Sequence, residues 1–213
     1  MQPIFITGIG TGIGKTIVSA IIAEALECDY WKPVQAGFEE GTDSLFVQNI
    51  ISNSGTVIYP EIYKLKLAAS PHIAARDEQL IIDLDLICER YAQLAKAGRQ
   101  MVIEGAGGLM VPLNERAFVA DLIKKLNAKV ILVSRNYLGS INHSLLTAMV
   151  CKTQQLNVTG WVFNDQYMQY EDEIANWSGY KKIASVPHSA SVTRAFIKSE
   201  AGKIKGSLVS VLS

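Results

Sequence analysis

The chain contains 213 residues, 49% of them hydrophobic, and its 20 basic and 20 acidic residues cancel to a formal net charge of zero. This length suits one folded domain spanning residues 1–213, and the charge balance argues against a nucleic-acid partner, which would require a basic surface. No apolar run reaches the length of a membrane span, and the three cysteines lack a paired spacing, so we expect a cytoplasmic protein without a membrane partner.

Apolar runs rich in β-branched residues alternate with helical patterns along the chain. Strands are predicted at Ile4–Thr7, Asp29–Val34, Ile62–Leu67, Met101–Glu104, Lys129–Ser134, Val158–Asn164 and Lys182–Val186. Helices are predicted at Lys15–Leu26, Ser44–Ile51, Leu84–Ala97, Phe118–Leu126, Ile141–Gln155, Gln169–Trp177 and Ser199–Val211. This alternation predicts an α/β fold, a single-domain, doubly wound, mostly parallel sheet with helices on both faces. Ligands of such sheets bind beyond the carboxyl ends of the strands.

The stretch IFITGIGTGIGKT, residues 4–16, predicts a phosphate-binding loop between the first strand and the first helix. Its glycines allow backbone N–H groups to turn toward phosphate oxygens, and the helix adds the positive end of its dipole. Lys15 supplies a full positive charge, and the hydroxyl of Thr16 can bind Mg²⁺. Gly8 lies six residues before Gly14, one more than in the usual G-x-x-x-x-G-K-[ST] pattern. We therefore expect a P-loop protein that binds a nucleoside triphosphate.

Two charged residues follow the second predicted strand. Lys32 ends an apolar run, and taken alone a strand-end lysine is best explained as a solvated charge. Beside a phosphate loop, however, it could stabilise a transferred phosphoryl group as a second cation. Asp43 precedes a predicted helix and is equally well explained as a helix cap or as a Mg²⁺ ligand.

Two further loops lie at strand ends. In MVIEGAGGLMVP, residues 101–112, a buried strand delivers Glu104, which resembles the Mg²⁺-binding carboxylate opposite a phosphate loop. The three glycines that follow suggest backbone close to a ligand. In LGSINH, residues 138–143, a helix N-terminus could hold a carboxylate, although N-capping by Ser140 is the simpler explanation from these residues alone.

Together these segments resemble the dethiobiotin synthetase family, whose phosphate loop has the same six-residue spacing. The similar segments, in the same order, are residues 7–16, 32–37, 42–44, 70–75, 102–112, 138–147 and 160–165. The resemblance implies an ATP- and Mg²⁺-dependent cyclo-ligase that closes a urea ring from 7,8-diaminopelargonate and CO₂. A substrate amine becomes a carbamate, whose oxygen attacks the γ-phosphate to give a carbamic–phosphoric anhydride and ADP. The second amine then closes the ring and releases phosphate.

The resemblance also implies roles for matching residues. Lys15 and Lys32 would be catalytic, and Thr16, Asp43 and Glu104 would bind Mg²⁺. The nucleotide would contact Gly12, Ile13, Gly14, Lys15, Thr16, Ile17, Asp43, Glu104, Gly105, Ala106, Gly107, Asn164, Asp165, Val186, Pro187 and His188. The substrate would contact Thr11, Lys32, Gln35 and Ala36, and in the neighbouring subunit of a homodimer Gly139, Ser140, Ile141 and Asn142. Among these, the amide of Asn164 would read the adenine edge, because it can both donate and accept hydrogen bonds.

Two positions depart from the family pattern, and two other functions stay open. Position 36 is Ala where the family often has Ser or Thr, and position 12 is Gly where an acidic residue is common. A partition-type ATPase switch usually carries a second lysine early in the phosphate loop, and the segment from Gly8 to Ile13 has none. A catalytically idle nucleotide-binding relative of the enzyme would keep the same loops.

Overall fold

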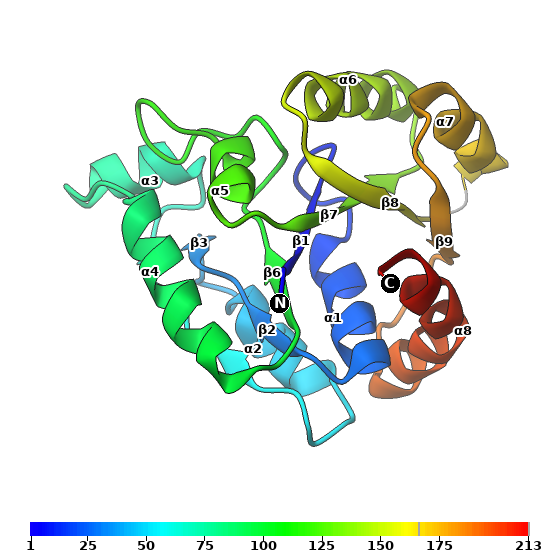
Figure 1. Ribbon diagram of the computed structural model, residues 1–213, viewed down its shortest axis with the longest axis horizontal. Coiled ribbons are helices and arrows are strands. Elements are labelled where there is room, and N and C mark those ends of the chain that lie inside the picture. The colour runs from blue at the N-terminus through cyan, green and yellow to red at the C-terminus, as the bar shows by residue number, and fades with distance from the viewer. Residues whose placement is uncertain (166, 213) are drawn as a thin grey trace.

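A parallel sheet of seven strands, in the order β4-β2-β6-β1-β7-β8-β9, forms the centre of the computed structural model, which describes residues 1–165 and 167–212 (Figure 1). Its strands are β1 (Ile4–Gly8), β2 (Asp29–Trp31), β4 (Ile58–Tyr59), β6 (Met101–Glu104), β7 (Lys129–Arg135), β8 (Asn157–Asn164) and β9 (Lys182–Val186). A second sheet pairs β3 (Val34–Ala36) with β5 (Tyr63–Leu65). Every described pair of these strands is parallel, which confirms the predicted fold class.

Helices cover both faces of the large sheet (Figure 1). One face carries α1 (Lys15–Leu26), α2 (Asp43–Ile50) and α8 (Arg194–Leu212). The other carries α3 (Pro71–Asp77), α4 (Leu84–Leu94), α5 (Val119–Lys125), α6 (Ser140–Thr153) and α7 (Glu171–Ser178). Two short 3₁₀ helices, η1 (Ala95–Ala97) and η2 (Tyr167–Gln169), follow α4 and precede α7. Among the described residues, no helix combines the length and apolar character needed to cross a bilayer.

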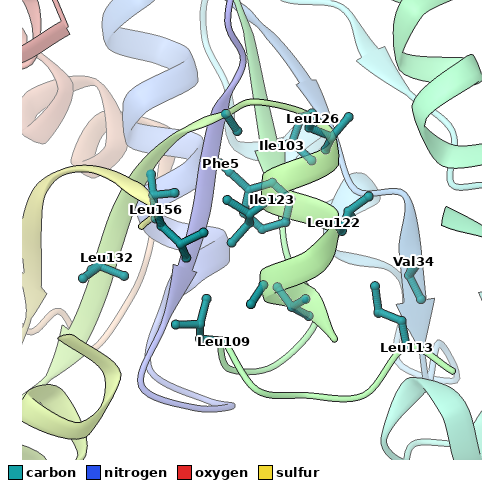
Figure 2. Packing of buried hydrophobic residues seen from close by; sticks show 14 of the residues in the cluster. Phe5, Val34, Ile103, Leu109, Leu113, Leu122, Ile123, Leu126, Leu132 and Leu156 are labelled. Atoms are coloured by element: carbon teal, nitrogen blue, oxygen red, sulfur yellow. The ribbon is translucent and has the colours of Figure 1, made fainter. Parts of the chain in front are cut away.

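The core consists of two hydrophobic clusters, one on each face of the sheet. In Figure 2, Leu122 and Ile123 of α5 and Leu126, just after the helix, pack over Phe5 of β1 and Ile103 of β6. Side chains alternate along a strand, so the neighbours of Phe5 in β1 face α1 and α8 instead. Burying each of these large apolar side chains stabilises the fold by roughly 1.5–3 kcal/mol. This packing fixes the central strands and therefore the positions of the loops that follow them.

The prediction of one strand over Asp29–Val34 is wrong, because the chain breaks there into β2 and β3. Pro33 has no backbone N–H to continue a ladder, and proline also restricts the residue before it. Beyond the break the chain leaves the large sheet, and β3 pairs with β5. Lys32 consequently lies at the carboxyl end of β2, beside the end of β6.

Other differences from the predicted elements have local causes. The C-terminal helix begins five residues earlier than predicted, at Arg194, and contains Gly202 and Gly206, whose low helix propensity weakened the pattern. Helix α3 was not predicted, although Pro71 at its first turn is a typical helix start. The two-residue strand β4 was also missed; it forms one edge of the described sheet and pairs there with β2.

Candidate active site

The loops after β1, β2 and β6 meet at one edge of the sheet, because these strands are neighbours and parallel. A cavity of about 920 Å³ opens at this edge. Of the expected site residues it is lined by Thr11, Gly12, Gly14, Lys15, Thr16, Ile17, Lys32, Gln35, Ala36, Asp43, Glu104, Ala106 and Gly107. The structure thus brings together residues that lie up to 96 positions apart in the sequence.

The phosphate loop requires glycine where other backbone or side-chain atoms approach it closely. A Cβ on Gly8 would lie 2.1 Å from the carbonyl oxygen of Val133, and one on Gly14, whose φ is +90°, would lie 1.8 Å from Nδ2 of Asn164. This Nδ2 donates a hydrogen bond to the carbonyl oxygen of Ile13 at 3.1 Å, so β8 supports the loop. No side chain caps α1. The N–H groups of its first turn can therefore bind an anion.

Two lysines and two carboxylates form a charged network in the cavity. The Lys32 ammonium donates to Oε1 of Glu104 at 3.1 Å and also to Oδ2 of Asp43. The Thr16 hydroxyl donates to the same Glu104 oxygen at 2.9 Å. Lys15 is buried and donates to the carbonyl oxygen of Gly10 at 2.7 Å. Both carboxylates therefore converge on one cation, the Lys32 ammonium, and the Thr16 hydroxyl joins the network through Glu104.

The two lysines differ in proton affinity. Burial lowers the pKa of Lys15 to about 8, and the nearby charge of Glu104 only partly opposes this effect. Burial would also lower the pKa of Lys32, but the carboxylates of Glu104 and Asp43 outweigh it and raise that pKa above its usual value. Lys32 is therefore charged at neutral pH. Positive charge is what a phosphate-binding cavity needs on its walls.

The side chains of Thr16, Asp43 and Glu104 fit Mg²⁺ chemically, because hard oxygen donors are its preferred ligands. Asp43 and Glu104 both pair with the Lys32 ammonium, which shows that the two carboxylates can share a cation. Within residues 1–165 and 167–212, no cluster of three or more His, Cys, Asp or Glu could hold a metal. Mg²⁺ commonly takes one or two carboxylates together with waters and phosphates, so this small set is sufficient for a nucleotide-bound ion.

Asp43 is not the cap of its helix, which corrects one of the two explanations given for it. The N-cap of α2 is Thr42, whose hydroxyl accepts a hydrogen bond from the N–H of Leu45 at 3.1 Å. The carboxylate of Asp43 pairs with Lys32 instead. The backbone N–H of Asp43 donates to Gln35 at 3.3 Å, so the Gln35 side chain holds the start of α2 against β3.

A second cavity of about 200 Å³ adjoins the first, and Gly12, Gly14, Ile17 and Val192 line both. The expected residues Asn164, Asp165, Pro187 and His188 line it, together with Arg135, Ser189 and Phe196. Arg135 and Asp165 form an ion pair at 3.4 Å. Val186, also expected here, is buried in the core and does not line either cavity.

The turn at residues 139–142 lines none of the three cavities described for this chain. Ser140 does not cap α6, because the N-cap is Gly139, with a φ of +104°. The hydroxyl of Ser140 is buried, lies 2.7 Å from the Tyr170 hydroxyl and accepts from the N–H of Tyr137. Tyr170 in turn donates to the carbonyl oxygen of Tyr137 at 2.9 Å. This closed set of hydrogen bonds fixes the turn and leaves the start of α6 without a side-chain cap.

Comparison with known proteins identifies the family. A family model described as an AAA domain matches residues 2–195. The chain is 46% identical over 206 residues to the ATP-dependent dethiobiotin synthetase BioD of Cytophaga hutchinsonii, covering 96% of this chain and 97% of the relative. It is 40% identical over 208 residues to the protein of the same name from Christiangramia forsetii, covering 97% and 98%. The chain belongs to the dethiobiotin synthetase family.

Solved structures share the fold of this dethiobiotin synthetase family member at low sequence identity. The MinC:MinD cell division complex of Aquifex aeolicus gives a TM-score of 0.65 at 12% identity, covering 100% of this chain and 96% of the matched chain. MinD of Pyrococcus horikoshii, solved with Mg-ADP, gives 0.62 at 16% identity, covering 99% and 93%. At these identities the likeness demonstrates a common P-loop fold and nothing further.

Some of the residues expected from the dethiobiotin synthetase resemblance lie behind the cavity wall, and some wall residues were not expected. Ile13 is buried, and Gly105 does not line the cavity, since a Cβ there would meet the Phe5 ring at 2.8 Å. Residues missed from the sequence include Phe46, Ala68, Ala69, Ser70, Pro71, Val111 and Val192. Residues 70–75 are one of the segments similar to the family, and Val111 lies in another, residues 102–112, whereas Val192 lies in none of them.

Proposed function

We propose that this protein is an ATP-dependent dethiobiotin synthetase that closes the urea ring of dethiobiotin from 7,8-diaminopelargonate and CO₂. The observation that carries the proposal is the position of Lys32 beside Glu104 and Asp43, in a large cavity directly adjoining the phosphate loop. A nucleotide switch needs a phosphate loop, but it does not need a cavity of this size for a phosphoryl acceptor. The family membership points to the same activity.

The two adjoining cavities give the nucleotide a continuous path. The base would lie in the smaller one, against Asn164, Pro187 and His188, and the phosphates would extend over the loop at Gly12 and Gly14 into the larger one. The free N–H groups at the start of α1 favour the β- and γ-phosphates there. Lys15, which is buried beside the loop, would pair with the same phosphates.

The diamine would occupy the remaining part of the large cavity, against Thr11, Lys32, Gln35 and Ala36. In the first step, a bond forms between the carbamate oxygen and the γ-phosphorus, while the bond from that phosphorus to ADP breaks. In the second, the free amine attacks the carbamate carbon, phosphate leaves with the electrons of its C–O bond, and the proton lost by the attacking nitrogen passes to the released phosphate. Lys15 and Lys32 would stabilise the negative charge on the transferred group, which is the main catalytic task in phosphoryl transfer.

Mg²⁺ would be held by Thr16, Asp43 and Glu104, and when bound it neutralises charge on the β- and γ-phosphate oxygens. The support for this assignment is the oxygen donor set, in which both carboxylates pair with one cation and the Thr16 hydroxyl bonds to Glu104. The buried Glu104 would be the fixed member of the set, and the more exposed Asp43 the adjustable one.

We also propose a homodimer in which residues 139–142 of the neighbouring subunit bind the distal carboxylate of the substrate. In support, this turn begins an uncapped helix and lines no described cavity of its own chain. Free N–H groups and the helix dipole favour an anion at such a position. Cys28, Cys88 and Cys151 are free thiols, which suit a reducing cytoplasm, where we place the protein.

The activity is tested by incubating the purified protein with 7,8-diaminopelargonate, bicarbonate, ATP and Mg²⁺ and identifying the product by mass. We expect dethiobiotin, together with phosphate release that mostly stops when the diamine is omitted. Equal ATP hydrolysis without diamine would instead support a switch-type ATPase. Nucleotide binding without any product would support an idle relative.

The shared active site is tested by mixing two inactive variants. Lys32→Ala removes a charge from one subunit's own part of the site, and Asn142→Glu places a competing carboxylate on the exposed docking turn. Asn142 is preferred to Ser140 for this purpose, because Ser140 is buried. A heterodimer would contain one site with both changes and one intact site, so activity should return. No recovery in proven heterodimers would place the whole site within one chain.

A further inference from the structure

Tyr30 is a fully buried tyrosine in β2, two residues before Lys32. Lys32 directly follows the strand, and the side chains of Tyr30 and Lys32 both contact the Glu104 carboxylate, so they lie on the same side of the sheet. Strand β2 pairs with β6 in the register Tyr30↔Val102 and Trp31↔Ile103, which brings the end of β6 alongside. The Tyr30 hydroxyl donates a hydrogen bond to Oε2 of Glu104 at 2.9 Å.

The two oxygens of the Glu104 carboxylate have different surroundings. Oε1 accepts from the Thr16 hydroxyl and from the Lys32 ammonium, on the cavity side. Oε2 accepts from Tyr30, which lies inside the protein. A carboxylate can rotate about its last side-chain bond, and contacts to both oxygens restrict that rotation. Tyr30 therefore holds the carboxylate from behind, while Oε1 is directed toward the cavity.

We infer that Tyr30 is a positioning residue that orients Glu104 for cation binding, and this inference rests on the proposed function of the site. Phenylalanine would fill the same space in the core, so packing alone does not account for the hydroxyl. A buried hydroxyl needs a partner, and the partner here is an acid of the active site. Groups that orient a metal ligand from behind commonly contribute 10- to 100-fold to metal affinity.

The variant Tyr30→Phe removes the hydroxyl and keeps the ring. The probe is Mn²⁺ in place of Mg²⁺, with binding to the protein–ADP complex followed by electron paramagnetic resonance. We expect Mn²⁺ affinity to fall by about 10-fold or more, with metal-free ADP binding unchanged. In the activity assay the variant should require more Mg²⁺, and a high Mg²⁺ concentration should restore much of kcat.

Tyr59→Phe is a matched control in β4, the strand that pairs with β2. The Tyr59 hydroxyl donates to Oδ2 of the buried Asp29 at 3.1 Å, and Asp29 lies at the opposite end of β2 from the cavity. Both variants therefore remove a tyrosine hydroxyl that donates to a buried carboxylate, but Asp29 lines none of the three cavities described. Tyr59→Phe should reduce thermal stability and leave Mn²⁺ affinity unchanged.

Two results would overturn the inference. One is Mn²⁺ affinity in Tyr30→Phe equal to that of the unchanged protein, with only the loss of stability that Tyr59→Phe also shows. If Tyr30→Phe does not fold, 4-fluorophenylalanine at position 30 fills the space of the hydroxyl without a donor, and unchanged Mn²⁺ affinity in that variant would be the second. Dethiobiotin formation by the unchanged protein is measured separately, so failure of the proposed function is distinguishable from failure of this inference.

Discussion

Two buried acids at opposite ends of neighbouring strands have similar immediate surroundings. Asp29 begins β2 and Glu104 ends β6, and each side chain is 1% exposed. Each accepts a hydrogen bond from a tyrosine hydroxyl, and each pairs with a cation, Arg99 in one case and Lys32 in the other. Burial and pairing alone therefore do not distinguish them.

The two acids differ in the other hydrogen bonds that surround them and in whether a ligand can reach them. Asp29 also accepts from the N–H of Val57, and Arg99 donates further to the carbonyl oxygens of Glu27 and Gly55 at 3.0 and 2.6 Å. These bonds join loops and suit a structural role. Besides Tyr30, the partners of Glu104 are the ammonium of Lys32 and the hydroxyl of Thr16, and both of these residues line the large cavity. A buried acid thus indicates a functional site when its partners are exchangeable and a ligand can reach them.

The largest expected effect is that of Lys32→Ala. The transition state of phosphoryl transfer is stabilised by preorganised positive charge, so kcat should fall by at least ~100-fold, with a smaller change in ATP binding. Arg99→Ala removes the corresponding cation from Asp29 and should lower the free energy of unfolding without changing kcat. Both variants are compared by steady-state kinetics and urea unfolding. Near-normal turnover in Lys32→Ala would make Lys32 a structural cation like Arg99.

The next effect concerns metal binding by Asp43. Asp43→Asn keeps the size of the side chain and loses its charge, and the helix remains capped by Thr42. We expect the Mg²⁺ concentration for half-maximal activity to rise by at least about 10-fold, because loss of a group that only orients a ligand already has an effect of this size. The control is Asp85→Asn, because Asp85 also lies in the first turn of a helix and pairs with a lysine, but on the exposed surface. An unchanged Mg²⁺ requirement in Asp43→Asn would remove Asp43 from the metal site.

The phosphate loop and the Glu104 strand were predictable because their signals are local. The helix Lys15–Leu26 and the strand Met101–Glu104 have the predicted bounds, since loop, cap and apolar run each occupy a few consecutive residues. The break at Pro33 was also readable, because a residue without an N–H is unfavourable inside a strand. The apolar pattern alone predicts a single strand across Pro33, and that prediction is wrong.

Other features depend on which strands become neighbours. The contact of Tyr30 with Glu104 arises from the pairing of β2 with β6, which sequence periodicity does not specify. The position of Arg135 in the second cavity likewise depends on strand pairing, because β7 pairs with β8 and places Arg135 beside Asn164. The two capping assignments also required backbone geometry, since Thr42 and Gly139, not the adjacent Asp43 and Ser140, are the caps. Residue types suggested the chemistry, whereas tertiary pairing determined the partners.

A moderate effect is expected on recognition of the adenine base of ATP. Asn164→Ala removes the group proposed to read adenine, together with the hydrogen bond to Ile13. Losing about 1.4 kcal/mol of binding would raise KM for ATP about tenfold, narrow the preference over GTP and change kcat little. Asn114→Ala is the control, because its amide likewise donates to a distant carbonyl oxygen, that of Ile82, at 2.8 Å. If nucleotide preference is unchanged in Asn164→Ala, other atoms of the second cavity read the base.

The smallest effect is expected at Glu24, an acid of α1 that is 8% exposed. Like Asp29, it lies away from the cavity and is expected to have a structural role. Its carboxylate accepts from the backbone N–H groups of Ser52 and Asn53 at 2.9 and 3.2 Å and from both of their side chains. Burial raises the pKa of Glu24, but these hydrogen bonds outweigh it, and the pKa lies below its usual value of 4.5. The charged form is thus favoured by folding.

The sign of the pH dependence at Glu24 follows from that lowered pKa. The stabilisation is present above the pKa of the unfolded chain and is lost as pH falls through the pKa of the folded protein. Glu24→Gln should therefore lower the free energy of unfolding by about 1 kcal/mol at neutral pH, and the difference should shrink below about pH 4.5 while activity is unaffected. Denaturant unfolding across this range, with the exposed Glu89→Gln as control, measures it. If the difference in unfolding free energy between Glu24→Gln and the unchanged protein stays constant with pH, the hydrogen-bonding shape of the side chain, and not its charge, holds the segment at Ser52 and Asn53. Glu24 would then act through its shape, unlike Glu104, whose charge is proposed to bind a cation.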